Sequence, residues 1–155
     1  MSEEVKTKAK IRLEKDMIFR CDLGEIGKSI GSMGEMALKD CYIDETNQSE
    51  ADMWGPNPSR LLGMALLGCL SASFIFCLKK RNFSTDNLVA EAEVIIGRNE
   101  KGFLRVKTIN VNIDVKIEDA ETRKRADQCR KMFEQYCTVT AAVREGIKVN
   151  VDLKY

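Results

Sequence analysis

The chain has 155 residues, of which 44% are hydrophobic and 32% are charged, which is the composition of an ordinary soluble globular domain. Its 25 basic and 24 acidic residues leave a net charge of +1, so strong electrostatic binding of nucleic acid is not expected. Histidine is absent, which excludes histidine-dependent triads and the usual zinc sites. We therefore expect no metal and no other cofactor.

The N-terminus, MSEEVKTKAK, lacks the apolar core of a secretion signal, so a cytoplasmic location is expected. Neither a GxxxxGK[ST] nor a GxGxxG phosphate-binding loop occurs in the sequence. A chain of this length forms one domain in most cases, and we expect a single domain over residues 1–155.

The first part of the chain has the pattern of antiparallel strands. Residues 5–13 and 17–23 alternate apolar and polar side chains, and the polar residues 14–16 between them can turn, which predicts a hairpin. A short strand is expected at residues 38–43, and the polar, acidic residues 44–52 indicate a surface loop.

A long helix is predicted over residues 58–81. Its central residues, 61–78, carry no charge, and both prolines of the chain, Pro56 and Pro58, stand at its start. An uncharged run of this length is at the lower limit for a membrane span, but it is equally typical of a helix enclosed by a protein core. Since a chain of this size cannot cover the whole helix, we expect a homodimer that buries it, and no membrane.

The second half of the chain alternates again. Strands are predicted at residues 88–97 and 104–117, with a bulge or a change of buried face near Thr108, where the apolar parity reverses. A helix with Asp119 as a possible cap follows and reaches residue 136, and a last strand is expected at residues 147–153. The order of elements predicts an α+β chain with antiparallel sheet.

Six cysteines are present, but no CxxC motif. A free cysteine usually behaves as a small buried apolar side chain. Two cysteines have more distinctive surroundings: Cys69 is central in the uncharged run, and Cys137 lies in the segment YCTVT. For the other four we expect simple packing: Cys21, Cys41, Cys77 and Cys129.

The segment GPNPSRLLGMALLGCLSASF, with the later segment FEQYCTVT, resembles the family of osmotically inducible protein C and organic hydroperoxide resistance proteins (OsmC/Ohr), in its OsmC-like branch. The resemblance rests on the G-P-x-P start of the helix, the Leu/Ala/Gly-rich turn before Cys69, the Y-C-x-V-[ST] setting of Cys137 and the closing strand IKVNVDLKY. The order of elements also agrees from about residue 8 to residue 155.

The resemblance implies an OsmC-like fold, in which antiparallel sheets wrap around two central helices of an intertwined homodimer. It also implies a thiol-dependent hydroperoxide reductase, a peroxidase of oxidative stress defence. Cys69 would attack the hydroperoxide and become a sulfenic acid, and Cys137 would resolve it as an intramolecular disulfide. A dithiol reductant would then reopen that disulfide.

Such a peroxidatic thiol needs help to ionise, because an unperturbed thiol, of pKa ~8.5, is mostly protonated at neutral pH. Cys69 is too far along its own helix to gain from the helix dipole, so a cation is expected nearby. In the family, a glutamate after the second proline holds an arginine from the first hairpin, but Ser59 occupies that position here. Arg12 and Arg20 flank the predicted turn, and the spacing does not select one of them.

The segment after Cys137 also departs from the family pattern, because Thr138 replaces the usual proline. The alternative is therefore an OsmC-fold protein without peroxidase turnover, which binds a small apolar ligand or senses oxidants through Cys69. A membrane-associated chain that uses residues 61–78 is the third reading.

Overall fold

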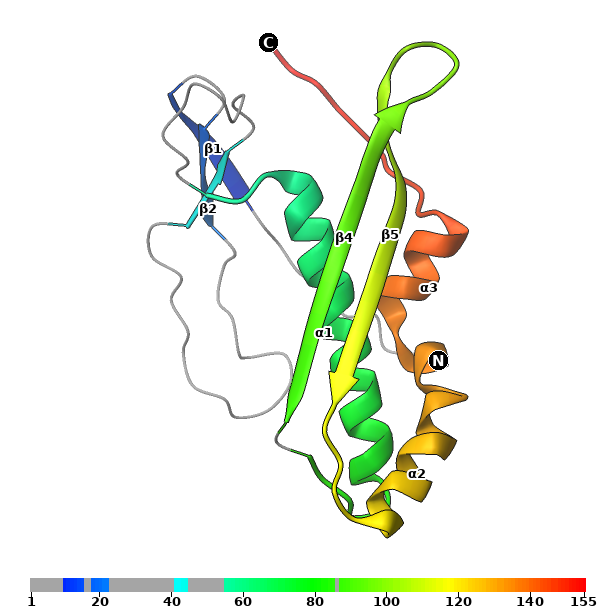
Figure 1. Cartoon of the computed structure of the whole chain (residues 1–155). Helices are drawn as coiled ribbons and strands as arrows, with labels where there is room; N and C mark the ends of the chain where they lie inside the picture. Colours follow the sequence, from blue (N-terminus) through cyan, green and yellow to red (C-terminus); the bar gives the residue numbers. More distant parts are fainter. Residues whose placement is uncertain (1–9, 16–17, 23–40, 45–54, 86) are drawn as a thin grey trace, which may run out of the picture. The chain divides into compact units, whose positions relative to one another are not determined.

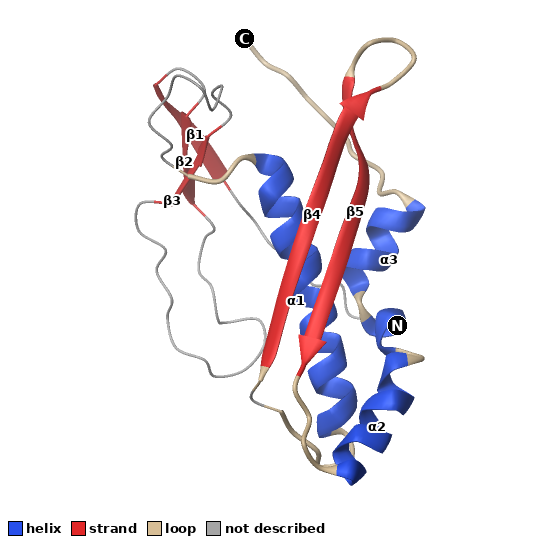
Figure 2. Ribbon diagram, in the orientation of Figure 1, coloured by secondary structure: helices blue, strands red, loops and turns tan. Residues whose placement is uncertain are grey.

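The computed structural model describes residues 10–15, 18–22, 41–44, 55–85 and 87–155, with only the backbone for residues 10–15, 18–22 and 41. The chain divides into two compact units, Met1–Leu61 and Leu62–Tyr155. Helices and strands both occur in it, as the α+β prediction requires (Figure 2). Most of the loop expected at residues 44–52 lies outside the described residues.

The first unit contains a three-stranded antiparallel sheet. Its strands are β1 (Lys10–Lys15), β2 (Ile18–Asp22) and β3 (Cys41–Asp44), in the order β1-β2-β3. This confirms the predicted hairpin, and β3 overlaps the strand expected at residues 38–43. Arg12 pairs with Arg20 across the hairpin, and Cys21 pairs with Cys41.

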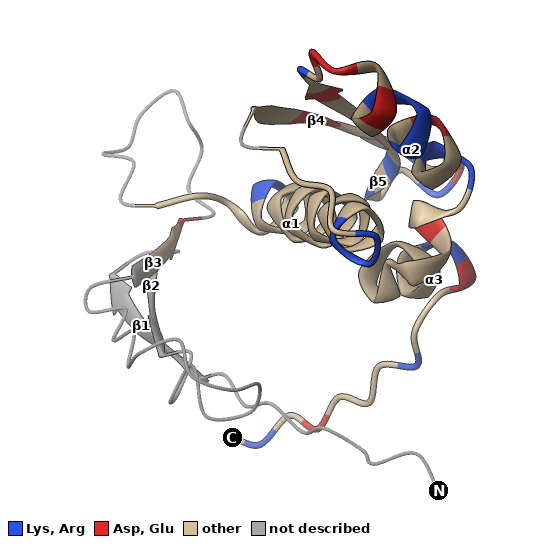
Figure 3. Cartoon of the chain, turned by 90° about the horizontal axis from the view of Figure 1, so that it is seen from below, with Lys and Arg blue, Asp and Glu red and all other residues tan. Residues whose placement is uncertain are grey.

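Helix α1 (Pro58–Lys79) confirms the predicted long helix to within two residues. Asn57 precedes it and accepts a hydrogen bond from the Arg60 N–H at 3.0 Å, which satisfies a donor of the first turn. Beyond its end, Asn82 has a φ of 60°, a left-handed conformation that helix termini favour. Figure 3 shows that the charged residues of α1 lie only at its two ends.

The second unit contains the hairpin of β4 (Leu88–Arg98) and β5 (Leu104–Val115), which runs along α1 (Figure 1). Ile95 pairs with Thr108 and Ile96 with Val106, so Lys107 is the extra residue of a bulge. Of the two causes expected for the reversal of parity near Thr108, a bulge or a change of buried face, the structure has the bulge.

One face of α1 packs against the hairpin. A Cβ added at Gly63 would lie 3.0 Å from Val94, so the small residue allows strand and helix to approach closely. Farther along α1, Phe74, Cys77 and Leu78 form a core cluster with Cys129. By length and composition alone α1 could cross a membrane, but this contact and cluster bury one side of it in protein.

Helix α2 (Ala120–Arg130) has Asp119 as its N-cap, as predicted, with the carboxylate accepting from the Thr122 N–H at 2.7 Å. The helix does not continue to residue 136. A 3-10 turn, η1 (Phe133–Tyr136), follows, because Lys131 and Met132 donate to carbonyls only three residues back. This tighter path brings Phe133 edge-on to Phe74 in α1, with ring centroids 5.7 Å apart.

The last part of the chain differs from the prediction. A further helix, α3 (Thr138–Glu145), was not predicted, and the strand expected at residues 147–153 is not formed. Its apolar residues are highly exposed, from 68% at Ile147 to 85% at Val151. A strand needs a backbone partner, and the described part of this single chain offers none to this segment.

Candidate functional site

Cys137 lies where η1 ends and α3 begins. It is the N-cap of α3, and its Sγ accepts a hydrogen bond from the Thr140 N–H at 3.4 Å. The Thr140 hydroxyl lies 3.0 Å from the same sulfur, and both residues are buried. The sulfur therefore occupies the place of the oxygen acceptor that usually caps a helix.

Cys69 lies in the middle of α1 and is partly exposed. Interactions with Cys137 and with the backbone of Thr138 and Val139 shift the pKa of its thiol, so this thiol lies near Cys137 at the start of α3. Two cysteines that are far apart in the sequence thus share the N-terminus of α3. The structure brings together the two thiols that the sequence singled out.

The two thiols titrate as a pair. Burial raises the pKa of Cys69, and so does its hydrogen bond with Cys137, against the opposing effect of the Val139 and Thr138 N–H groups. Burial also acts to raise the pKa of Cys137, but hydrogen bonds from Cys69 and from the Thr140 side chain and backbone hold that pKa below its usual value. Of the two thiols, Cys137 is therefore the one that ionises first as the pH rises.

The N-terminus of α3 supplies anion-stabilising N–H groups at this site. A helix N-terminus carries a partial positive charge, and cysteines there ionise more readily. Helix α3 was not predicted, so its dipole did not enter the expectation that Cys69 needs a nearby cation. The signal was present in the sequence: the helix-favouring run AAVRE after Thr140 ends at Gly146, a typical helix stop.

The arginine expected beside Cys69 is not identified. Arg12 and Arg20 belong to β1 and β2 of the first unit, where only the backbone is described, so the choice between them stays open. Among the described residues no arginine forms a hydrogen bond with Cys69. Ser59, at the position of the family's glutamate, donates instead to the Asn57 side chain at 2.7 Å.

A cavity of about 1320 Å³ lies in the second unit. Apolar side chains of α1 and β5 supply much of its wall, among them Leu66, Leu70 and Val111, and Thr140 lies at its surface. Charged side chains of β5, α2 and α3 also line it, among them Arg130 and Arg144. Since Thr140 contacts the Cys137 sulfur, the cavity extends to the residue next to the thiol pair. Within the described part of the chain, no cluster of acidic residues and cysteines could hold a metal ion.

A second pair of cysteines corrects the sequence analysis. Cys77 and Cys129, expected to be free packing residues, form a disulfide between α1 and α2, with Cα atoms 5.7 Å apart. Their separation of 52 residues and the lack of a CxxC motif gave no hint of the pairing. Only the packing of α2 on α1 brings them together.

The family model for OsmC-like proteins matches residues 47–152, and the chain belongs to this family. Among curated proteins, none matches the chain significantly.

Solved structures of relatives have the same fold at low sequence identity. The organic hydroperoxide resistance protein OhrB of Bacillus subtilis superposes with a TM-score of 0.64 at 20% identity, covering 97% of this chain and 98% of that chain. An OsmC-like protein of unknown function from Vibrio cholerae gives a TM-score of 0.64 at 12% identity, covering 90% and 94%. A hypothetical protein from Aquifex aeolicus gives 0.60 at 21% identity, covering 92% and 89%. At these identities the likeness shows the fold alone.

Proposed function

We propose that the protein is a thiol-dependent hydroperoxide reductase in which Cys69 is the peroxidatic and Cys137 the resolving cysteine. The observation that carries the proposal is that the two thiols lie close enough at the N-terminus of α3 to shift each other's pKa. Membership of the OsmC-like family supports it, and one fold relative is an organic hydroperoxide resistance protein.

Exposure favours Cys69 as the attacking sulfur, because Cys69 is partly exposed while Cys137 is fully buried. Once Cys137 is ionised, its thiolate can accept the proton of the neighbouring Cys69 thiol. The Cys69 thiolate then attacks the outer oxygen of ROOH and the O–O bond breaks. The proton now on Cys137 passes to the leaving alkoxide, which gives ROH, a Cys69 sulfenic acid and a Cys137 thiolate. Attack by Cys137 on that sulfur forms the disulfide and releases water.

A small dithiol restores the enzyme by two thiol–disulfide exchanges, and it leaves as its own cyclic disulfide. The cavity that reaches Thr140 has charged as well as apolar lining residues, and its apolar wall from α1 and β5 suits the alkyl part of an organic hydroperoxide. We further propose a single domain over residues 1–155, a cytoplasmic homodimer, and no binding of membranes or nucleic acid.

The test follows consumption of tert-butyl hydroperoxide by the purified protein with dithiothreitol as reductant. Cys69→Ser should abolish consumption, and Cys137→Ser should stop turnover after one oxidation. Cys41→Ser, in the sheet of the first unit, is the matched control and should keep full activity. Peptide mass spectrometry of the oxidised wild type should find a Cys69–Cys137 disulfide, and finding both thiols free after peroxide treatment would refute the proposal.

The second candidate is an oxidant sensor or small-ligand binder of the same fold, without turnover. The observation that favours it is the Ser59–Asn57 hydrogen bond at the position where the family carries its activating glutamate. In that case peroxide would oxidise Cys69 once, at a stoichiometry of one per chain, and dithiothreitol would sustain no consumption.

A further inference from the structure

The Cys77–Cys129 disulfide joins α1, the helix that carries Cys69, to α2. We infer that Cys77, Cys129 and Arg125 form a thiol–disulfide centre that a small dithiol opens and a small disulfide closes, with Arg125 stabilising the Cys77 thiolate. None of these residues takes part in the proposed peroxide reaction, so the inference does not depend on it.

The two sulfurs lie at the ends of two helices. Cys77 is in the last turn of α1 and Cys129 is in the last turn of α2, and their exposed fractions are 2% and 0%. Terminal turns open at a lower free-energy cost than helix centres. A buried disulfide between helix ends can therefore be reached by local opening, without unfolding of the whole unit.

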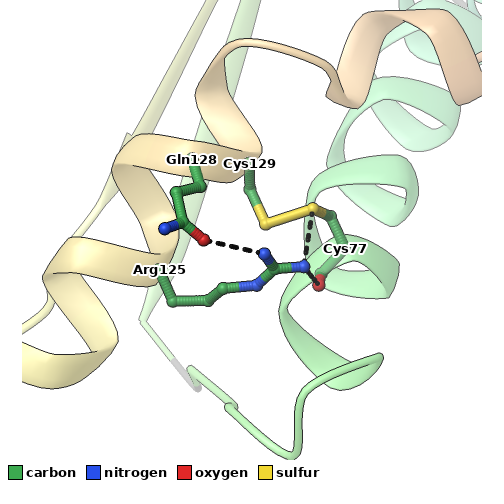
Figure 4. The surroundings of a disulfide bond; sticks show 4 residues. All are labelled: Cys77, Arg125, Gln128 and Cys129. Carbon is green, nitrogen blue, oxygen red and sulfur yellow. Dashed lines mark hydrogen bonds between the residues drawn. A yellow bond between two sulfur atoms is a disulfide. The ribbon is translucent and has the colours of Figure 1, made fainter.

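Arg125 is directed at this disulfide from within α2 (Figure 4). Its Nη2 lies 3.6 Å from the Cys77 sulfur and donates to the Cys77 carbonyl at 3.1 Å, while Nη1 donates to the Gln128 side chain at 3.0 Å. Its Nε is buried and has no partner. No carboxylate of the described residues forms an ion pair with it, so its charge is not neutralised there.

The guanidinium satisfies a carbonyl in the last turn of α1 when the disulfide is closed, and it is also well placed for a thiolate at Cys77. The C-terminal ends of helices carry partial negative charge, which disfavours an anion at either cysteine. The Arg125 charge offsets that effect at Cys77, the sulfur that it contacts. Cys77 is therefore the leaving thiolate when the disulfide is reduced.

The reaction balances with a dithiol as the only reductant. One thiolate of the dithiol attacks Cys129 Sγ, the Cys77–Cys129 bond breaks, and Cys77 leaves as a thiolate paired with Arg125. The second thiol of the reagent then attacks the mixed disulfide and frees Cys129, and the reagent leaves as its cyclic disulfide. Closing is the reverse reaction.

The experiment uses the full-length Cys69→Ser/Cys137→Ser variant, so that the proposed peroxidase pair cannot contribute. The protein is equilibrated at pH 8 in buffers of reduced and oxidised dithiothreitol of varied ratio, then alkylated, and the reduced fraction of Cys77 and Cys129 is measured by peptide mass spectrometry. A reversible two-electron transition of this pair is expected, with circular dichroism unchanged across it.

Arg125→Met removes the charge that stabilises the reduced form, so about tenfold more reductant should be needed at the midpoint. Arg125→Lys should lie between this variant and the parent. Lys124→Met removes an exposed charge from the neighbouring position of α2 and should leave the midpoint unchanged.

Three outcomes would overturn the inference. The first is that both thiols stay free in the most oxidising buffer. The second is that the disulfide persists until the protein unfolds, which would make it a structural cross-link only. The third is that the midpoints of Arg125→Met and Lys124→Met coincide.

Discussion

Thr140 is the residue with the most direct control over the proposed site. Its hydroxyl and its N–H both contact the Cys137 sulfur, and both lower the pKa of Cys137 after burial has acted to raise it. The side chain is buried, so these contacts are not weakened by water.

Thr140→Val removes the hydroxyl and nearly preserves the shape of the side chain. The lost hydrogen bond is worth about 1 kcal/mol, so alkylation of the thiol pair by iodoacetamide at pH 7 should slow roughly fivefold. The pH profile of alkylation should move to higher pH, because a thiolate that loses a donor forms less readily. Thr138→Val is the control, since Thr138 affects the pKa of Cys69 through its backbone, which this substitution keeps. Equal pH profiles of alkylation for the two variants would argue against the role of the Thr140 hydroxyl.

Asp119 sets the start of α2, the helix that carries Cys129. The N–H and then the hydroxyl of Thr122 donate to its carboxylate, and these contacts lower the pKa of Asp119. A lowered folded-state pKa stabilises the fold above the ordinary pKa of the carboxyl group, and that stabilisation disappears as the pH falls through the lowered value.

Asp119→Ala should therefore lower the thermal unfolding temperature at pH 7, with a smaller difference from the wild type near pH 2. Scanning calorimetry at both pH values measures it. Glu121→Ala, in the first turn of the same helix, is the comparison for general charge effects. A difference for Asp119→Ala that does not change with pH would exclude this contribution of the ionised cap.

The Cys77–Cys129 disulfide ties α2 to α1 across 52 residues of sequence. Closing a loop of this length removes entropy from the unfolded chain worth about 4 kcal/mol. Cys77→Ala/Cys129→Ala should lower the free energy of unfolding by about that amount in urea titrations without reductant. Excess dithiothreitol should lower the free energy of unfolding of the wild type by a similar amount and leave that of the double variant unchanged. If the reductant has no effect on the wild type, the cross-link does not stabilise the fold.

At the scale of the whole molecule, the C-terminal segment 147–153 has exposed apolar side chains and pairs with no strand among the described residues. An alternating segment with an exposed apolar face and free backbone groups is prone to pair with another strand. Val151→Lys should therefore weaken the proposed homodimer, with at least a tenfold rise in its dissociation constant measured by sedimentation equilibrium. Asn150→Lys adds the same charge on the other face and should leave the dimer intact, and a wild type that sediments as a monomer would contradict the proposal.

The limits of sequence reasoning follow from the same features. The strands, the uncharged helix, the bulge and the Asp119 cap depend on local patterns, and all were predicted. The contact between Cys69 and Cys137 was anticipated through the family resemblance, not through spacing. The Cys77–Cys129 pair could not be anticipated, because it depends on how α2 packs on α1. The strand at residues 147–153 was predicted from its alternation of apolar and polar residues. It is not formed, because alternation in the sequence does not supply a hydrogen-bonding partner.

The two cysteine contacts constrain how the length of this chain can change. The spacing from Cys69 to Cys77 in α1 equals the spacing from Cys129 to Cys137. The pairs Cys69–Cys137 and Cys77–Cys129 therefore form two contacts between chain segments that run in opposite directions. One residue inserted in α1 between Cys69 and Cys77 would turn one of these cysteines by about 100° relative to the other, and one of the two contacts would be lost. The tip of the β4–β5 hairpin carries no such constraint. Insertions and deletions should therefore be tolerated around Gly102 and rejected between Cys69 and Cys77.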